Sequence, residues 1–286
     1  RFVMAHTASS HGRRWAVFSP EMQPWETFVS EVAEVWAGKP FWGVGRMSDE
    51  EVAGAERWME DRIVMLVCDT EKEVPSISWI VERAPACALR FGITDLLIDP
   101  WNEADHSRTA GVSETEHIGL SLQRLKAFAL RHGCNVWVIA HPAKPAPGSG
   151  NALPPGPYDI SSSAHWYNKA DIGITVHSPG DGRAEIHLWK ARFSKRWGKK
   201  GSMAALDVDV LTGRYSTPAS FFEAPAYSLL MSRSAAVMTE TGTRTMRLTR
   251  ASKTRAVPLD CGTCSAVMPE MLAPAGELRL AIEDPR

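Results

Sequence analysis

The chain has 286 residues, 44% of them apolar and 23% charged, which is the composition of an ordinary soluble globular protein. This length suits one large domain or two small ones. A net charge of −1 excludes a global attraction to nucleic acid or membranes, so either would need a local patch. No apolar run approaches the roughly 20 residues that span a bilayer, so we expect no membrane partner.

The five cysteines favour a reducing, cytoplasmic compartment. Their number is odd and two of them lie in or beside apolar segments, which argues against a disulfide framework. Cys261 and Cys264 form a single CxxC, which we interpret as free thiols, because zinc sites usually need a second pair of ligands. The first residues lack the apolar core of a signal peptide, and there is no initiator Met. We therefore expect the chain to be cut from a longer protein.

The first half of the chain alternates apolar runs with helical patterns. Four apolar runs predict buried strands, at 15–18, 63–67, 95–99 and 135–140. Apolar residues at helical spacing predict helices over 25–35 and 118–129. Ser113 and Glu116 form a capping box before the second of these, and Gly133 is placed to end it. Strand and helix in alternation predict a parallel sheet with helices on both faces.

The second half begins with a segment, 142–157, that holds six prolines and three glycines in sixteen residues and predicts a mobile loop. Alternating patterns then predict strands that extend the sheet, the last two as a hairpin around Gly198–Gly201: 170–176, 184–193 and 203–210. From residue 217 to 286 neither period is clear, which predicts a poorly structured tail or sequence foreign to the domain. The expected fold class is α/β, a mainly parallel sheet with a C-terminal antiparallel extension, in a domain over 1–216.

Three predicted strands end in polar residues that suit nucleotide chemistry. Glu21 follows the first strand, Asp99 ends the third and His141 follows the fourth. Ligands of open α/β sheets bind at the carboxyl ends of strands. One carboxylate can hold Mg²⁺ through water, a second can activate the attacking water, and a neutral group can sense the γ-phosphate. Taken singly, these residues could equally be a turn aspartate, a solvated glutamate and a structural histidine.

A cationic segment at 189–201 is the second candidate site. Six positive charges fall within eleven residues, interleaved with Phe193 and Trp197: Lys190, Arg192, Lys195, Arg196, Lys199 and Lys200. In a nearly neutral chain, such a concentration predicts local phosphate binding. Lys190 and Arg192 are two residues apart, so on a strand they would point the same way.

Five segments resemble, in order and spacing, the RecA-fold motor of DnaB-family replicative helicases, closest to the Twinkle-like and phage primase–helicase branch. They are 18–21 (FSPE), 96–103 (LLIDPWNE), 136–144 (VWVIAHPAK), 158–171 (YDISSSAHWYNKAD) and 189–201 (WKARFSKRWGKKG). The resemblance covers residues 1–216, about three quarters of the chain. It implies an ATP-dependent ring helicase that translocates on single-stranded DNA.

The resemblance implies a role for each candidate residue of the nucleotide site. Glu21 would polarise the attacking water, Asp99 would be the Walker B aspartate on Mg²⁺, and His141 would be the sensor. Arg192 would be the arginine finger, with Lys190 beside it, and both would reach ATP bound to the neighbouring subunit. That arrangement implies a homo-oligomeric ring, usually a hexamer.

The resemblance also implies a DNA-binding surface. The loop 142–157 and the segment 158–165 would face the central channel, where Lys144, Ser162 and Ser163 would contact DNA. The family usually has Gly within the stretch written here as Ser161, Ser162 and Ser163, and its loss would stiffen or distort this loop.

One family element is absent from the sequence. The phosphate loop Gly-x-x-x-x-Gly-Lys-[Ser/Thr] does not occur in the chain. By the resemblance it would lie just upstream of Arg1, and residues 1–10 would be the helix after it. We therefore expect an N-terminally truncated motor that binds and hydrolyses ATP poorly by itself.

Three other functions remain open from the sequence. A different RecA-type ATPase, of DNA repair or partition, would share Glu21 and Asp99. A non-catalytic single-strand-binding module would use 189–200, with Phe193 and Trp197 as stacking platforms. A metal hydrolase would use Asp99, Glu103 and His141, although their spacing is not that of a compact metal site.

Overall fold

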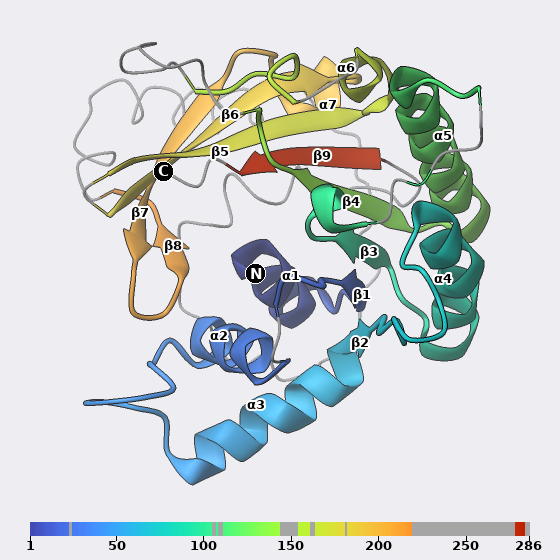
Figure 1. The fold of residues 1–286 in the computed structure, drawn as a ribbon. Coiled ribbons are helices and arrows are strands. Elements are labelled where there is room, and N and C mark those ends of the chain that lie inside the picture. Colours follow the sequence, from blue (N-terminus) through green and yellow to red (C-terminus); the bar gives the residue numbers. More distant parts are fainter. Residues whose placement is uncertain are drawn as a thin grey trace, which may run out of the picture.

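The computed structural model describes residues 1–22, 25–104, 107, 111–143, 154–160, 164–180, 182–218 and 278–283 (Figure 1). Its helices are α1 (Phe2–His11), α2 (Trp25–Ala37), α3 (Asp49–Arg62), α4 (Ile77–Phe91), η1 (a 3₁₀ helix, Trp101–Glu103), α5 (Glu114–His132), α6 (His165–Lys169) and α7 (Ser194–Trp197). Its strands are β1 (Trp15–Phe18), β2 (Ile63–Met65), β3 (Asp95–Ile98), β4 (Asn135–Ala140), β5 (Ile172–Gly180), β6 (Arg183–Ala191), β7 (Met203–Asp209), β8 (Arg214–Ser216) and β9 (Leu278–Glu283).

The strands form a nine-stranded sheet in the order β2-β1-β3-β4-β9-β5-β6-β7-β8. The strands from β2 to β5 in this order are parallel to their neighbours, whereas β5, β6, β7 and β8 pair antiparallel. The predicted fold class, a mainly parallel sheet with a C-terminal antiparallel extension, is therefore confirmed.

Helices cover both faces of the parallel strands (Figure 1). Leu96 and Ile98 of β3 pack in a core with residues of α4 and α5. Leu97, between them, packs on the other face with residues of α1 and α2. Because alternate residues of β3 enter two different cores, all four positions of the strand are buried. This explains why its sequence is a continuous apolar run rather than an alternating one.

Local signals in the sequence set several helix ends. Ser113 and Glu116 form the predicted capping box of α5, and Gly133 ends that helix in the left-handed region, at φ 63°. A second capping box, Ser48 with Glu51, begins α3. Sequence patterns singled out neither α3 nor α4. A single fully buried residue, Ala55, gives α3 a weak apolar stripe, and α4 contains Pro85.

One part of the tail, which was predicted to be irregular, is instead a strand. Residues 278–283 form β9, which lies between β4 and β5 and pairs parallel with both. The rest of 217–286 beyond Pro218 lies outside the described residues, as do Cys261 and Cys264. The other three cysteines, Cys68, Cys87 and Cys134, are free thiols. Within the described ranges, no helix is long and apolar enough to cross a membrane.

Candidate nucleotide site

Glu21, Asp99 and His141 lie at one edge of the sheet. They follow β1, β3 and β4, three neighbouring strands that run parallel, so their carboxyl ends meet. The Asp99 N–H donates to the Phe18 carbonyl at 2.9 Å, which ties the start of one turn to the end of the adjacent strand. The structure thus places at one edge of the sheet the three residues that sequence patterns placed at strand ends.

Glu21 and His141 face each other directly. His141 Nε2 lies 3.8 Å from Glu21 Oε1, at ion-pair distance if the imidazole is protonated. The His141 N–H donates to the Asn102 side-chain oxygen at 3.1 Å, so η1 holds the residue after β4 in place. Both side chains are partly exposed, which leaves them accessible to a ligand.

Two polar atoms at this edge have no hydrogen-bond partner among the described residues although they are buried. They are Ser19 Oγ and His141 Nδ1. Buried polar atoms are rarely left unpaired, and exceptions occur where a ligand or water completes the set. Together with the carboxylates of Glu21 and Asp99, they give this edge of the sheet several oxygen and nitrogen atoms that can contact a ligand.

Asp99 also lines a cavity of about 250 Å³, with Arg1 and two glutamates of α2, Glu31 and Glu34. Arg1 forms an ion pair with Glu31 at 2.6 Å. Among the described residues, neither Glu21 nor His141 lines this cavity, so Asp99 faces a space partly separate from theirs.

Lys190 and Arg192 lie at the opposite edge of the sheet. Ala191, the last residue of β6, pairs with Ile172, the first residue of β5, and β5 runs parallel to β9. The end of β6 therefore lies where the parallel strands begin, near α6 and α7 in Figure 1. The two cations cannot contribute to the Glu21–Asp99–His141 edge of the same subunit.

The side chain of Arg192 is held by the buried carboxylate of Asp171, which no sequence pattern singled out. Its Nε lies 2.8 Å from Asp171 Oδ1, and its N–H donates to the Asp171 carbonyl. Lys126 of α5 also contacts both oxygens of this carboxylate, at 2.8 and 2.9 Å. Lys190 instead donates to the carbonyls of Tyr167 and Asn168. Burial, and next the positive charge of Arg192, lowers the pKa of Lys190.

The structure describes only some of the other residues that were predicted to form sites. Lys144, Ser162 and Ser163 lie outside the described residues. In the cationic segment, Phe193 is exposed but Trp197 is buried against Ile172 and Ile174, so Trp197 cannot be a stacking platform. Within the described ranges, no group of three His, Cys, Asp or Glu side chains is arranged to hold a metal.

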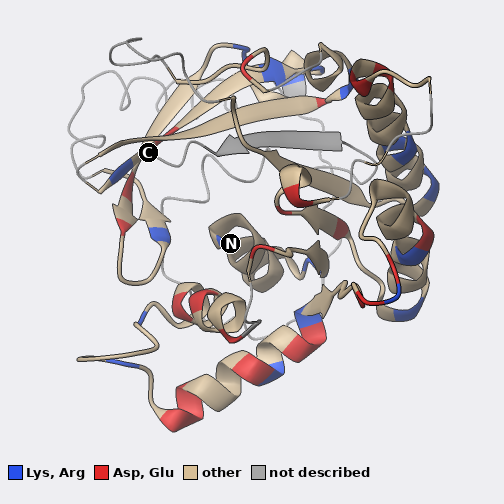
Figure 2. Cartoon of the chain, viewed as in Figure 1, with Lys and Arg blue, Asp and Glu red and all other residues tan. Residues whose placement is uncertain are grey.

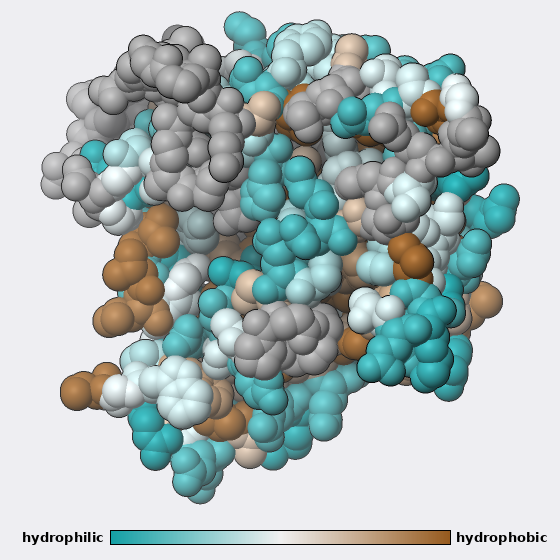
Figure 3. Space-filling model, viewed as in Figure 1, coloured by the Kyte–Doolittle hydropathy of each residue, from teal (hydrophilic) through white to brown (hydrophobic). Residues whose placement is uncertain are grey.

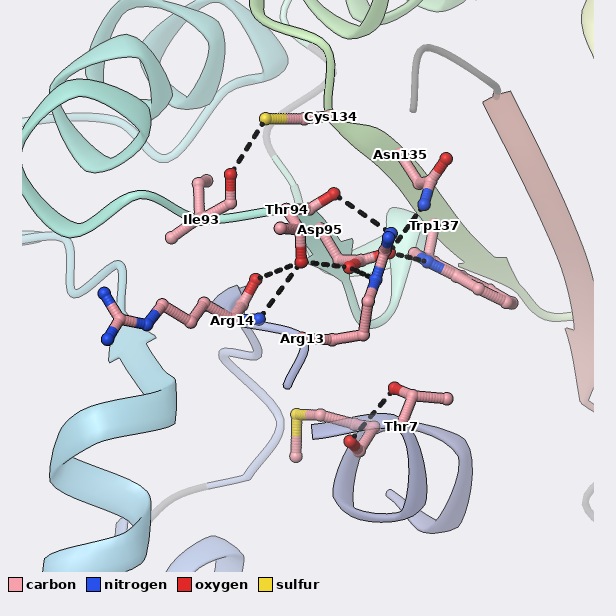
Figure 4. A network of polar contacts seen from close by, with 10 residues as sticks. Thr7, Arg13, Arg14, Ile93, Thr94, Asp95, Cys134, Asn135 and Trp137 are labelled. Atoms are coloured by element: carbon pink, nitrogen blue, oxygen red, sulfur yellow. Dashed lines mark hydrogen bonds and ion pairs between the residues drawn. The ribbon is translucent and has the colours of Figure 1, made fainter. Parts of the chain in front are cut away.

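A polar network lies at the amino ends of β3 and β4, and no sequence pattern predicted it (Figure 4). Asp95 is almost fully buried, and Arg13 contacts both of its oxygens, at 2.6 and 2.8 Å. Thr94, Asn135 and Trp137 donate to the same carboxylate. Because every carboxylate oxygen is engaged, we interpret this network as structural.

Part of the chain is similar to known proteins. No protein-family model matches it. It is 42% identical over 190 residues to the Twinkle homolog protein, chloroplastic/mitochondrial, of Arabidopsis thaliana, a match that covers 62% of this chain and 26% of that protein. The chain thus spans about a quarter of the length of this curated relative. The crystal structure of the RadB recombinase is similar to it with a TM-score of 0.45 and 14% identity, over 73% of this chain and 81% of that chain. The sequence match confirms the predicted resemblance to Twinkle-like proteins.

Proposed function

We propose that this chain is part of the motor of an ATP-dependent ring DNA helicase, which couples ATP hydrolysis to translocation on single-stranded DNA. One observation carries the proposal: Glu21, Asp99 and His141 follow three adjacent parallel strands and meet at one edge of the sheet. The identity shared with the Twinkle homolog protein supports it.

In the proposed site, each residue has a distinct task. Glu21 accepts a proton from, or orients, the attacking water, and its partial exposure leaves room for that water. His141 offers Nδ1 to a ligand oxygen, while its N–H is fixed by Asn102. Asp99 would hold Mg²⁺ through water. When bound, Mg²⁺–ATP supplies the phosphoryl group and the charge that offsets its transfer.

The opposite placement of Lys190 and Arg192 supports a ring. A cation that lies across the sheet from its own nucleotide edge can act on a nucleotide only in another subunit. Arg192 pairs with Asp171 through Nε, and its planar guanidinium is the group best suited to a phosphate. We propose that Arg192, with Lys190 beside it, completes the site of the adjoining protomer in a ring, usually of six.

We also propose which residues contact DNA. Lys144, Ser162 and Ser163 would contact single-stranded DNA in the ring's channel. The cytoplasmic location stays a prediction, since the name of the Arabidopsis relative places that protein in chloroplasts and mitochondria. Because the sequence has no phosphate loop, the chain by itself should hydrolyse ATP poorly.

The test uses the chain joined to a phosphate-loop segment ahead of residue 1. We expect Asp99→Ala and Glu21→Gln each to lower DNA-stimulated ATP hydrolysis at least about 100-fold, the scale of losing one general base or one metal ligand. Glu21→Gln should still bind ATP, because only the proton acceptor is lost. Glu82→Gln, an exposed change on α4, is the control and should leave turnover unchanged.

Mixed rings test the role in trans. Arg192→Ala should be inactive alone, yet mixing it with Glu21→Gln subunits should restore part of the activity. Some interfaces then combine an intact Arg192 with an intact Glu21. If the mixture stays inactive while both variants still assemble, Arg192 does not act across subunits.

A further inference from the structure

Asp171 is a buried carboxylate that two cations share. It is 4% exposed and lies directly before β5, where Ile172 pairs with Ala191, the last residue of β6. Arg192 Nε lies 2.8 Å from Asp171 Oδ1, and Lys126 Nζ lies 2.8 and 2.9 Å from the two carboxylate oxygens. The carboxylate therefore joins the amino end of β5, the carboxyl end of β6 and the middle of α5.

The two cations are held differently. The Lys126 side chain is 23% exposed and contacts both oxygens from a helix. The Arg192 side chain is 42% exposed and belongs to the residue that follows β6. Its backbone is fixed separately, because the Arg192 N–H donates to the Asp171 carbonyl at 2.8 Å. The guanidinium can thus leave the carboxylate while the strand ends stay paired.

Positive charge exceeds negative charge around Asp171. Figure 2 shows Lys and Arg residues at this end of β6, in α7 and along α5. The neighbouring Lys190 donates to the carbonyls of Tyr167 and Asn168 rather than to the carboxylate. Lys126 and Arg192 are therefore the two cations that share the single charge of Asp171.

This sharing makes the contact of Arg192 reversible. A buried carboxylate that loses its counter-charge is strongly unfavourable. Because Lys126 contacts both oxygens, Asp171 stays compensated when Arg192 moves away. The departure of the half-exposed guanidinium therefore costs little, unlike the breaking of an isolated buried ion pair.

We propose that Asp171 and Lys126 are positioning residues that make Arg192 a movable group. Asp171 docks the guanidinium within its own subunit, and Lys126 neutralises the carboxylate when Arg192 moves to the nucleotide of the adjoining protomer. The inference rests on the proposed function in naming that nucleotide as the destination. The docking itself needs no nucleotide.

The first test measures how fast phenylglyoxal modifies Arg192 in the full chain, read from the mass of the peptide that holds this residue. Lys126→Met keeps the aliphatic stem but removes the second cation, so Arg192 should dock more tightly on Asp171. We expect roughly 5- to 10-fold slower modification, whereas loosened packing would make it faster. Arg131→Met is the matched control, because it removes a positive charge from an exposed position of α5. It should leave the rate unchanged.

The second test measures DNA-stimulated ATP hydrolysis by the chain joined to a phosphate-loop segment. Lys126→Met should lower kcat at least about 10-fold at unchanged KM for ATP, because Arg192 leaves Asp171 less readily. Adding Asp171→Asn should restore most of the lost kcat, because the double variant removes both opposing charges and releases Arg192. A purely structural role predicts that the second change deepens the loss.

The inference is overturned if Lys126→Met leaves the modification rate of Arg192 unchanged or raises it, or if adding Asp171→Asn lowers kcat further. A joined parent chain without DNA-stimulated ATP hydrolysis would refute the proposed function. The phenylglyoxal rates would then still decide whether Arg192 is docked on Asp171.

Discussion

At the scale of single residues, Asp95 shows how a charge is accommodated inside an apolar strand. Burying a carboxylate costs several kcal/mol unless it is paired and hydrogen-bonded. Here Arg13 supplies the opposite charge, and the side chains of Thr94, Asn135 and Trp137 donate to the remaining acceptor sites (Figure 4). The network joins the turn after α1 to the first residues of β3 and β4.

Asp95→Asn should therefore destabilise the protein. The change leaves the mostly buried Arg13 guanidinium without its counter-charge, and we expect the free energy of unfolding to fall by about 3 kcal/mol. Urea denaturation followed by circular dichroism measures this. Asp61→Asn is the control, because Asp61 pairs with Arg14 in solvent and such pairs contribute under about 1 kcal/mol. Equal losses in the two variants would show that the Asp95 network is not a stabilising one.

At the scale of elements, β5 and β6 meet closely at Gly173. A Cβ on Gly173 would lie 2.2 Å from ring atoms of Trp189, so only glycine leaves room for the indole. The ring of Tyr167, a residue of α6, packs against the same indole. The packing of β6 on β5 therefore sets the position of α6.

Gly173→Ala should displace Trp189 and lower the free energy of unfolding by about 1–3 kcal/mol, the usual cost of overpacking. Gly54→Ala is the control. Its Cβ would come no closer than 3.3 Å to Trp36, and alanine favours helix α3. Thermal unfolding followed by tryptophan fluorescence compares them, and a Gly173→Ala variant as stable as Gly54→Ala would contradict the packing argument.

Local elements were predictable from the sequence, but their long-range pairings were not. Apolar runs gave β1 and β4 their observed bounds, because a strand buried on both faces leaves a continuous signal. Parallel strands bring their carboxyl ends together, which made the Glu21–Asp99–His141 edge predictable. Arg13 and Asp95 are 82 residues apart, however, and no period links them. The same holds for β9, whose partners lie far away in sequence.

At the scale of the whole molecule, the surface carries exposed apolar side chains on one hairpin. Val210 and Leu211, in the turn between β7 and β8, are 81% and 67% exposed. Figure 3 shows hydrophobic residues gathered where Figure 1 places this hairpin. Apolar patches at the surface of a soluble protein often mark interaction sites.

If this hairpin contributes to the proposed ring, Val210→Ser combined with Leu211→Ser should shift the oligomer to smaller species. Apolar burial at the subunit contact would be lost. Sedimentation velocity at several concentrations measures the shift. Leu130→Ser is the matched control, because Leu130 is also 67% exposed but lies on α5. Unchanged sedimentation of the double variant would remove the hairpin from the interface.

The place of β9 has a consequence for how the molecule reaches its native state. The strands β5, β6, β7 and β8 form a meander of near neighbours, and β1, β3 and β4 are linked by helical crossovers. Only the meander is built from contacts that are short-range in the chain, because β1 pairs with the distant β3. The union of the two halves also requires a distant segment to insert between β4 and β5, a loop closure with a large entropic cost. We therefore expect the meander to form early and the insertion of β9 to be slow.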